Sequence, residues 1–274
     1  MDLEHSFLKD NIEASRFTVI CSGKGSGKSH LFLSFFKLFY MHKKYDKYIL
    51  ILPELETEID KKYEFLRSLK DLIIYTEYDE SIFIEAKEMS KQYKIFLCID
   101  DATNIMFKNK NDEIITKIAS TTRHGKGIAL FLITHALSNI LLPQVRALID
   151  HLFIGVFGNM KIIKNSLYEE NLSLIMKWEE FREMYVNNIV NREESHPFLY
   201  LNRKRQYDYN VHEWEMLQYY NKEIKPNGKA QIKEVNHKQI EYNKLKDDVR
   251  KSLIKKSLKP EKPKRLIVGK TVNL

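Results

Sequence analysis

Runs of apolar residues alternate along the chain with polar segments, and the length of each run indicates its structure. Short runs rich in β-branched and aromatic side chains are typical of strands buried on both faces of a sheet. We expect strands at residues 16–21, 45–52, 71–75, 94–100, 128–134, 151–157 and 197–201. Longer or helically spaced runs predict helices at residues 29–40, 81–92, 112–122 and 141–149, the last with Pro143 in its first turn. Strands separated by helices predict an α/β fold with a mainly parallel sheet flanked by helices.

This alternation ends near residue 205. Residues 211–220 and 232–258 have helical character at uneven spacing, and residues 259–274 contain two prolines and five Lys or Arg. We therefore predict two parts, a domain at residues 1–205 and a short basic extension at residues 206–274. The extension is expected to be partly helical and to end in a flexible tail.

Composition limits the class of protein. No apolar run approaches the roughly 18–20 residues that span a bilayer, and the N-terminus is acidic where a signal peptide is basic. The two cysteines, Cys21 and Cys98, cannot form a disulfide framework or a Cys-based zinc site. We expect a soluble, reduced, cytoplasmic protein without a membrane partner. The net charge is +8, and residues 221–274 hold 16 Lys and Arg against 6 Asp and Glu, so polyanion contacts should concentrate there.

Glycine clusters at one point, because three of the nine glycines lie within five residues. They belong to Ser-Gly-Lys-Gly-Ser-Gly-Lys-Ser at residues 22–29, between an expected strand and an expected helix, which is a P-loop. Its glycines let backbone N–H groups turn toward a phosphate at the positive end of the helix. The predicted nucleotide-binding residues are Gly23, Lys24, Gly25, Ser26, Gly27, Lys28 and Ser29.

The last two residues of the P-loop predict the cofactors. Lys28 is expected to reach the β- and γ-phosphates of ATP, and Ser29 to place its hydroxyl on Mg²⁺. Ser22 stands where the usual pattern has glycine. Either Gly23, displaced by one position, takes that turn, or Ser22 adopts it at some strain.

Two acids follow the expected strand at residues 94–100. That strand is almost entirely apolar and ends in Asp100, with Asp101 directly after it. Sites in parallel sheets lie at the carboxyl ends of strands, and a P-loop needs an acid for the metal and a group that polarises water. We expect Asp100 to hold the Mg²⁺ shell and Asp101 to orient or deprotonate the attacking water. ATP hydrolysis is the predicted reaction.

A hydroxyl and two arginines complete the predicted catalytic set. Thr134 ends the apolar strand at residues 128–134, where it can hydrogen-bond the γ-phosphate or the lytic water, and its neighbour His135 can do likewise. Arg123 precedes that strand on a polar loop and is the candidate arginine finger, a residue that acts on a neighbouring subunit's nucleotide and accelerates hydrolysis by about 10³–10⁵. Arg146 is the rival candidate for this role.

These features occur in one order: the P-loop, the strand ending in two acids, Arg123-His124, the strand ending in Thr134, and Leu-Leu-Pro-Gln-Val-Arg at residues 141–146. That order resembles the viral genome-packaging ATPases of the FtsK–HerA superfamily, including the poxvirus-type and small-podovirus packaging motors. The likeness covers residues 16–157, roughly half the chain, and the expected strand at residues 197–201 fits the last strand of the family.

The resemblance implies a fold and an assembly. The fold would be a RecA-like, additional-strand (ASCE) P-loop NTPase core. The subunits would form a homo-oligomeric ring, a pentamer or hexamer, that pumps double-stranded DNA into a preformed capsid. The protein would then act in the host cytoplasm and transiently at the capsid portal vertex.

The resemblance also implies roles for single residues. Lys28 and Ser29 would bind the nucleotide and Mg²⁺, Asp100 and Asp101 would be the metal-shell and catalytic acids, and Arg123 would be the finger acting in trans. One further position departs from the family, because His135 stands where relatives usually carry Gln or Asn.

DNA contacts are expected to be independent of sequence, and such contacts are made to phosphates. Lys108, Lys110 and Lys126 are candidates for them. The basic extension suits docking to DNA, to a structural RNA or to the portal. It is too short for the nuclease-like domain of the small-podovirus motors, so we predict no nuclease activity.

Two other functions use the same chemistry. A helicase-loader or scaffold-type ATPase switch would assemble with ATP but turn over little on DNA. A filamentous-phage export ATPase would usually need a membrane anchor. We favour DNA packaging, because an acid directly after Asp100 suits hydrolysis rather than nucleotide binding alone.

Overall fold

A computed structural model of the chain describes residues 16–52, 61–100, 119, 127–135, 141, 143–169, 172–173, 176–191, 196–202 and 224–233. All of them lie in the compact unit Met1–Val235, and residues 236–274 lie outside the described residues. No helix among these ranges is long and apolar enough to cross a membrane.

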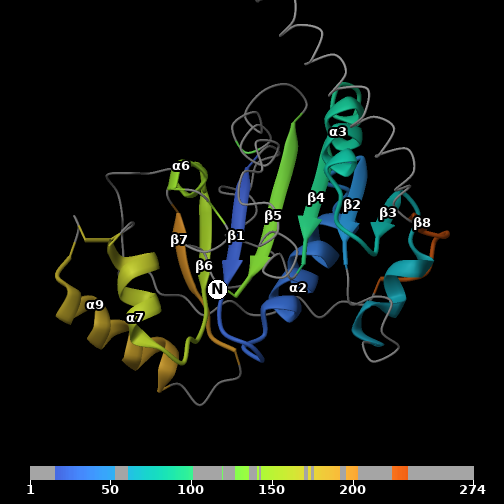
Figure 1. The fold of residues 1–274 in the computed structure, drawn as a ribbon. Helices are drawn as coiled ribbons and strands as arrows, with labels where there is room; N and C mark the ends of the chain where they lie inside the picture. Colours follow the sequence, from blue (N-terminus) through green and yellow to red (C-terminus); the bar gives the residue numbers. More distant parts are fainter. Residues whose placement is uncertain are drawn as a thin grey trace, which may run out of the picture. The chain divides into compact units, whose positions relative to one another are not determined.

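The described part of the chain is built on a sheet of eight strands (Figure 1). The strands are β1 (Phe17–Cys21), β2 (Lys47–Ile51), β3 (Leu72–Tyr75), β4 (Ile95–Ile99), β5 (Ile128–Thr134), β6 (His151–Ile154), β7 (Leu199–Asn202) and β8 (Gln231–Lys233). Their order across the sheet is β7-β6-β1-β5-β4-β2-β3-β8. All neighbours are parallel except β6 and β7, which confirms the predicted mainly parallel α/β fold.

The position of β5 defines the type of P-loop fold. β5 lies between β1, which leads into the P-loop, and β4, which leads into Asp100. The register pairs Cys21 with Thr134 and Ile99 with Leu132, so the three strands end at one edge of the sheet. An extra strand between the P-loop strand and the acid strand is the defining feature of the predicted additional-strand core.

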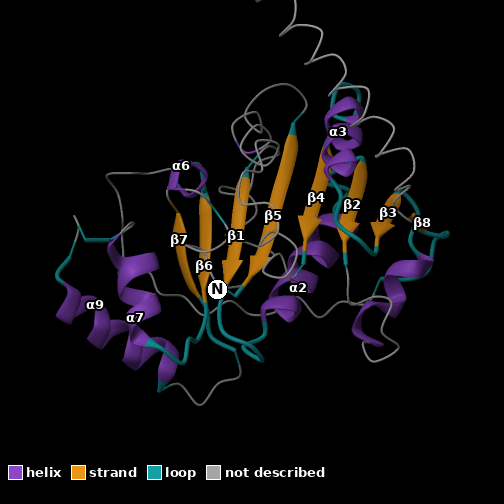
Figure 2. Cartoon of the chain, viewed as in Figure 1, coloured by secondary structure: helices purple, strands orange, loops and turns teal. Residues whose placement is uncertain are grey.

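The helical segments surround this sheet (Figure 2). They are α2 (Lys28–Met41), η3 (Lys61–Ser68), α3 (Glu80–Met89), α6 (Pro143–Arg146), α7 (Met160–Ile163), η4 (Lys164–Tyr168), α9 (Trp178–Tyr185) and η5 (Val186–Val190). As expected, Pro143 begins its helix, where a missing N–H costs nothing. That helix is shorter than the predicted range 141–149, and Ala119 is the one described residue of the predicted helix at 112–122.

Aromatic side chains join α2 to the centre of the sheet. Phe35 lies 5.1 Å from Phe153 of β6, and Phe39 lies 5.8 Å from Phe96 of β4, measured between ring centroids. Phe96 and Phe131 of neighbouring strands are 4.9 Å apart. Tilted and edge-on ring pairs at these distances add about 0.5–1.5 kcal/mol each to the burial of the rings. This packing holds the middle of α2, the helix that begins in the P-loop, against the central strands.

The helices that follow β6 were missed in the sequence analysis. On α9, Trp178, Phe181 and Tyr185 recur at spacings of three and four, and Phe181 and Tyr185 are fully buried. With the charged residues on its other face, this is the pattern of an amphipathic helix, a signal that the sequence analysis did not use. The Tyr185 hydroxyl donates to the Gly155 carbonyl oxygen at 2.8 Å and accepts from the Phe157 N–H at 3.1 Å. The helices are thereby fastened to the segment directly after β6.

One expectation for the basic extension is wrong. Residues 232–233, expected to begin a helix, belong to strand β8, which pairs in parallel with β3. The edge of β3 offers backbone hydrogen-bond partners, and these outweigh a weak local helical preference. Lys233 also forms an ion pair with Glu85 of α3. Part of the segment assigned to the extension therefore completes the sheet, while the boundary at residue 205 stays a prediction.

Candidate functional site

The P-loop follows β1 and wraps around the start of α2. Gly25 and Gly27 have φ of +72° and +84°, in the left-handed region that favours glycine. Neither Ser22 nor Gly23 has a positive φ, so Ser22 takes the first position of the loop without backbone strain. Gly23 is favoured for a different reason, because a Cβ on it would make a tight contact, at 3.0 Å, with the carbonyl oxygen of Val156.

The Ser22 side chain fits because the residue directly after the neighbouring strand β6 is a glycine. A Cβ on Gly155, directly after β6, would lie 2.7 Å from the Cβ of Ser22. The Ser26 hydroxyl donates to the Gly23 carbonyl oxygen at 2.6 Å and also hydrogen-bonds the Ser22 hydroxyl. A hydroxyl has one proton, so Ser22 is the donor in that second bond. The serine that departs from the P-loop pattern thus connects the start of the loop to Ser26 through a hydrogen bond.

Lys28 points back into the loop that precedes it. The residue is only 8% exposed, and its ammonium group lies 3.1 Å from the Ser22 carbonyl oxygen, 2.8 Å from that of Gly23 and 3.0 Å from Nδ1 of His135. An ammonium has only donors, so Nδ1 of His135 is the unprotonated ring nitrogen. Nδ1 also lies 3.2 Å from the Ser22 carbonyl oxygen. The two atoms are close because both accept hydrogen bonds from the same ammonium group. His135 therefore lies in the site, as the sequence suggested.

Asp100 lies beside the first turn of α2. Its backbone N–H donates to the Ile51 carbonyl oxygen at 3.0 Å, and the residue is 5% exposed. The Ser29 hydroxyl lies 3.5 Å from Oδ2 of Asp100. Hydroxyl and carboxylate oxygens are the ligands that Mg²⁺ prefers, together with phosphate oxygens and water. Ser29 and Asp100 therefore fit the predicted metal site, with no other described residue required.

A tyrosine that the sequence analysis missed also contacts Asp100. The hydroxyl of Tyr63, on η3, donates to Oδ2 of Asp100. Burial, followed by the negative charge of Asp100, raises the pKa of Tyr63 and keeps its phenol protonated. A signal for this element exists, since Tyr63, Leu66 and Leu69 are all fully buried and recur every third residue. That is the period of a 3₁₀-helix, whose side chains at i and i+3 lie on one face.

The predicted catalytic residues do not all lie in the site. Thr134 does, because it is fully buried beside Cys21 and its carbonyl oxygen accepts from the Ser22 N–H at 3.3 Å. Arg146 does not. It ends α6, which precedes β6 and therefore lies at the opposite edge of the sheet from the P-loop (Figure 1). There its Nη1 donates to the Leu141 carbonyl oxygen at 2.6 Å.

Several predicted residues lie outside the described ranges. They are Asp101, Arg123, Lys108, Lys110 and Lys126. Their roles in water activation, in trans catalysis and in DNA contact stay predictions.

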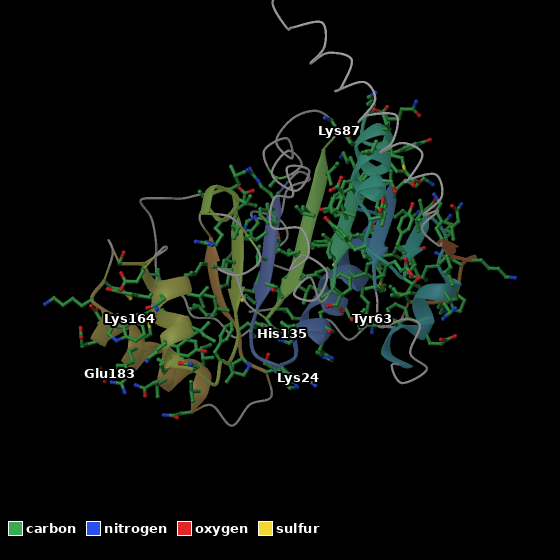
Figure 3. The ribbon with its side chains drawn as sticks, in the orientation of Figure 1. Lys24, Tyr63, Lys87, His135, Lys164 and Glu183 are labelled. Carbon is green, nitrogen blue, oxygen red and sulfur yellow. The ribbon has the colours of Figure 1, made fainter. Side chains whose placement is uncertain are left out.

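The side-chain view places the site at one end of the sheet. Lys24, His135 and Tyr63 lie near the ends of the central strands, whereas Lys87 on α3 lies at the opposite end (Figure 3). Lys24 is exposed at the tip of the P-loop. Cys21, directly before the loop, is not a nucleophile, because burial raises the pKa of its thiol to about 12 despite the opposing charge of Lys28.

Comparisons with known proteins identify the fold. No protein-family model matches the chain, and no curated protein matches it by sequence. Solved structures do match. The genome packaging NTPase B204 from Sulfolobus turreted icosahedral virus 2, in complex with ATPγS, superposes with a TM-score of 0.51 at 22% identity. This chain has the fold of a viral genome-packaging NTPase. The match covers 70% of this chain and 93% of B204.

Two more structures of this fold agree. The B204 complex with AMP gives a TM-score of 0.52 at 21% identity and covers 79% of this chain and 100% of B204. B204 described as the DNA-packaging ATPase from Sulfolobus turreted icosahedral virus gives 0.51 at 22%, covering 71% and 96%. The resemblance stated from the sequence is confirmed at the level of the fold.

Proposed function

We propose that the chain is an ATP-hydrolysing translocase of double-stranded DNA that packages a viral genome into a preformed capsid. The observation that carries the proposal is the meeting of Lys28, Ser29 and Asp100 at one sheet edge, in the fold shared with B204. A P-loop lysine, a metal-binding hydroxyl and a buried acid are three of the parts that nucleoside triphosphate hydrolysis requires.

The residues of the site divide the work between them. Backbone N–H groups of the P-loop and the start of α2 bind the β- and γ-phosphates, and the Lys28 ammonium exchanges its present acceptors for phosphate oxygens. Ser29 and Asp100 hold Mg²⁺, which when bound neutralises the charge that develops on the phosphate oxygens. Asp101 orients the attacking water, and Thr134 with His135 contacts the γ-phosphate from the end of β5.

Motor action adds a second subunit and DNA. We propose a ring, a pentamer or hexamer, in which Arg123 reaches the nucleotide of a neighbouring subunit, with Arg146 as the alternative finger. The position of Arg146 at the far edge of its own sheet is compatible with action only on a neighbour. Lys108, Lys110 and Lys126 would contact DNA phosphates, and the basic extension would dock on DNA, a structural RNA or the portal.

The test is steady-state ATP hydrolysis with and without long double-stranded DNA. We expect DNA to stimulate the native chain, and the stimulation to weaken as salt rises, because phosphate contacts release counterions. Lys28→Ala should lower turnover by about 10²-fold or more, since it removes a donor that stabilises charge in the transition state. Lys87→Ala, which removes a lysine at the opposite end of the sheet, is the matched control and should leave turnover unchanged.

A mixing experiment tests the shared site. Asp101→Asn and Arg123→Ala should each be inactive alone, and mixing them should restore part of the activity, because some interfaces then pair an intact acid with an intact finger. Hydrolysis that is indifferent to DNA, with Arg123→Ala fully active, would refute a translocase. It would leave a nucleotide-dependent switch such as a helicase loader.

A further inference from the structure

The hydroxyl of Tyr63 shares one oxygen of Asp100 with the P-loop. Oδ2 of Asp100 accepts from Tyr63 and lies 3.5 Å from the Ser29 hydroxyl. Tyr63 comes from η3, between β2 and β3, so it reaches the carboxylate from a part of the chain remote in sequence from the P-loop and from β4. Three segments therefore meet at a single carboxylate oxygen.

Filling the core does not explain this tyrosine. Its ring is fully buried beside the face formed by Leu66 and Leu69, and a phenylalanine would occupy the same space. A buried hydroxyl costs free energy unless it is hydrogen-bonded, and hydrogen bonds to a charged acceptor are stronger than neutral ones. The Tyr63 hydroxyl has one proton to donate, and it donates that proton to the carboxylate expected to hold the metal. The contact thus fixes which way Asp100 faces.

We infer that Tyr63 is a positioning residue of the nucleotide site, whose hydroxyl holds the Asp100 carboxylate beside Ser29 and so sets the affinity for nucleotide bound together with Mg²⁺. The inference rests on the proposed function, because it assumes that the P-loop binds a nucleoside triphosphate. Tyr63 acts through Asp100 and is not itself a catalytic residue. A partner of this kind orients a metal ligand in the same way that hydrogen-bonded residues around other metal sites do.

The test is the equilibrium binding of a fluorescent ATP analogue, measured with Mg²⁺ and again in EDTA. Tyr63→Phe keeps the ring and removes the hydroxyl. It should weaken binding in Mg²⁺ by about 10-fold or more, the usual cost of losing a residue that orients a metal ligand. Binding in EDTA should stay at the native value, because the P-loop is intact. A role in packing alone would weaken both equally.

Tyr45→Phe is the matched control. Tyr45 is also buried in the core, at 4% exposure, but among the described residues its hydroxyl has no hydrogen-bond partner. This variant should bind the analogue like the native chain in both conditions. Thermal unfolding of both variants shows whether each is folded at the temperature of the titration.

A double-mutant cycle separates action through Asp100 from any other route. In an Asp100→Asn background, Tyr63→Phe should add little further loss, because the carboxylate that it positions is already gone. Equal losses in both backgrounds, or native Mg²⁺ dependence in Tyr63→Phe, would overturn the inference while leaving the proposed function in place. If the native chain does not bind the analogue at all, the proposed function fails, and the inference fails with it.

Discussion

The P-loop contacts two other parts of the chain, its two flanks. The β6 flank is the segment directly after β6, residues 155–157, and the β4 flank is Asp100, directly after β4. The contacts of the two flanks differ in kind. On the β6 flank, the contacts are neutral and close: the Gly23 N–H donates to the Val156 carbonyl oxygen at 2.8 Å, and the Gly155 N–H donates to that of Cys21 at 3.0 Å. On the β4 flank, the contacts converge on one charged group, Asp100. There the Ser29 hydroxyl is 3.5 Å from the carboxylate.

The same difference appears in the buried tyrosine of each flank. Tyr185 hydrogen-bonds two backbone groups, the carbonyl of Gly155 and the N–H of Phe157, so it fixes a chain path. Tyr63 hydrogen-bonds the carboxylate of Asp100, so it fixes the direction of a charge. The β6 flank therefore determines the shape of the P-loop, and the β4 flank determines its chemistry. Substitutions on the first should cost stability, and substitutions on the second should cost activity.

The largest expected effect is that of Asp100→Asn on the β4 flank. The change keeps the size of the side chain and removes the charge that binds Mg²⁺. Charge stabilisation by a bound metal is worth several kcal/mol of transition-state energy, so hydrolysis should fall by about 10²-fold or more. The Tyr63 hydroxyl can still donate to the amide oxygen, so the free energy of unfolding should change little. Initial rates and urea unfolding measure the two quantities.

An Asp100→Asn protein that is fully active, or one that is inactive only because it is unfolded, would contradict the division between the flanks. The matched comparison is Gly155→Ala on the β6 flank, which should lose stability and keep nucleotide binding.

Gly155→Ala on the β6 flank should cost stability first. A Cβ there would lie 2.7 Å from the Cβ of Ser22 and 2.8 Å from the ring of Phe198, both of which are buried. Overpacking of this kind costs about 1–3 kcal/mol in free energy of unfolding. Ser22→Gly removes one of the two clashing atoms and restores the usual P-loop glycine, so the double variant should regain part of the loss. Urea unfolding of the two single variants and the double variant measures the coupling.

Additive losses in the double variant would mean that Ser22 and Gly155 do not act as a pair. Nucleotide binding by Gly155→Ala at a temperature well below its unfolding transition should remain close to native. If Gly155→Ala lost nucleotide binding without losing stability, the β6 flank would contribute to binding directly, which contradicts the proposed division.

These flanks also explain which parts could be predicted from the sequence. β1, β4 and β5 are almost entirely apolar runs, and along the chain they lead in turn to the P-loop, to Asp100 and to Thr134. The sheet edge that holds Lys28, Asp100 and Thr134 therefore follows from local pattern. The roles of Tyr63 and Gly155 do not follow from local pattern. Each matters because of a residue far away in sequence that it touches in space, and no local pattern carries that information.

The helices after β6 and the strand β8 were also missed in the sequence analysis, for two different reasons. α9 has an amphipathic pattern, with Trp178, Phe181 and Tyr185 at helical spacing and charged residues between them, so its signal was present in the sequence. β8 has three residues, two of them exposed, and it is a strand because it pairs with β3 and because Lys233 meets Glu85. Pairing with an existing edge decides its structure, and its own composition does not.

The smallest expected effect extends the comparison to charge that lies away from the P-loop. Glu85 on α3 accepts hydrogen bonds from Tyr75 of β3 and from Lys233 of β8. Burial alone would raise the pKa of Glu85, but the hydrogen bonds from Lys233 and Tyr75 and the positive charge of Lys233 outweigh it and lower the pKa below its ordinary value. The carboxylate is more than one third exposed, so solvent screens the pair and its contribution to stability should stay below about 1 kcal/mol.

The sign of the pH dependence follows from that lowered pKa. The folded state holds the Glu85 proton more weakly than the unfolded state, so the stabilisation is complete above the ordinary glutamate pKa and is lost as pH falls through the folded-state value. Glu85→Gln should therefore reduce the free energy of urea unfolding at neutral pH and match the native chain in acid. Glu88→Gln is the control, because Glu88 near the end of α3 pairs with Lys91 in the turn that follows, both side chains are well exposed, and the effect at neutral pH should be smaller. Hydrolysis should be unchanged in both variants, since neither carboxylate touches either flank of the P-loop. A native pH profile in Glu85→Gln would mean that backbone pairing with β3 alone holds β8 in the sheet.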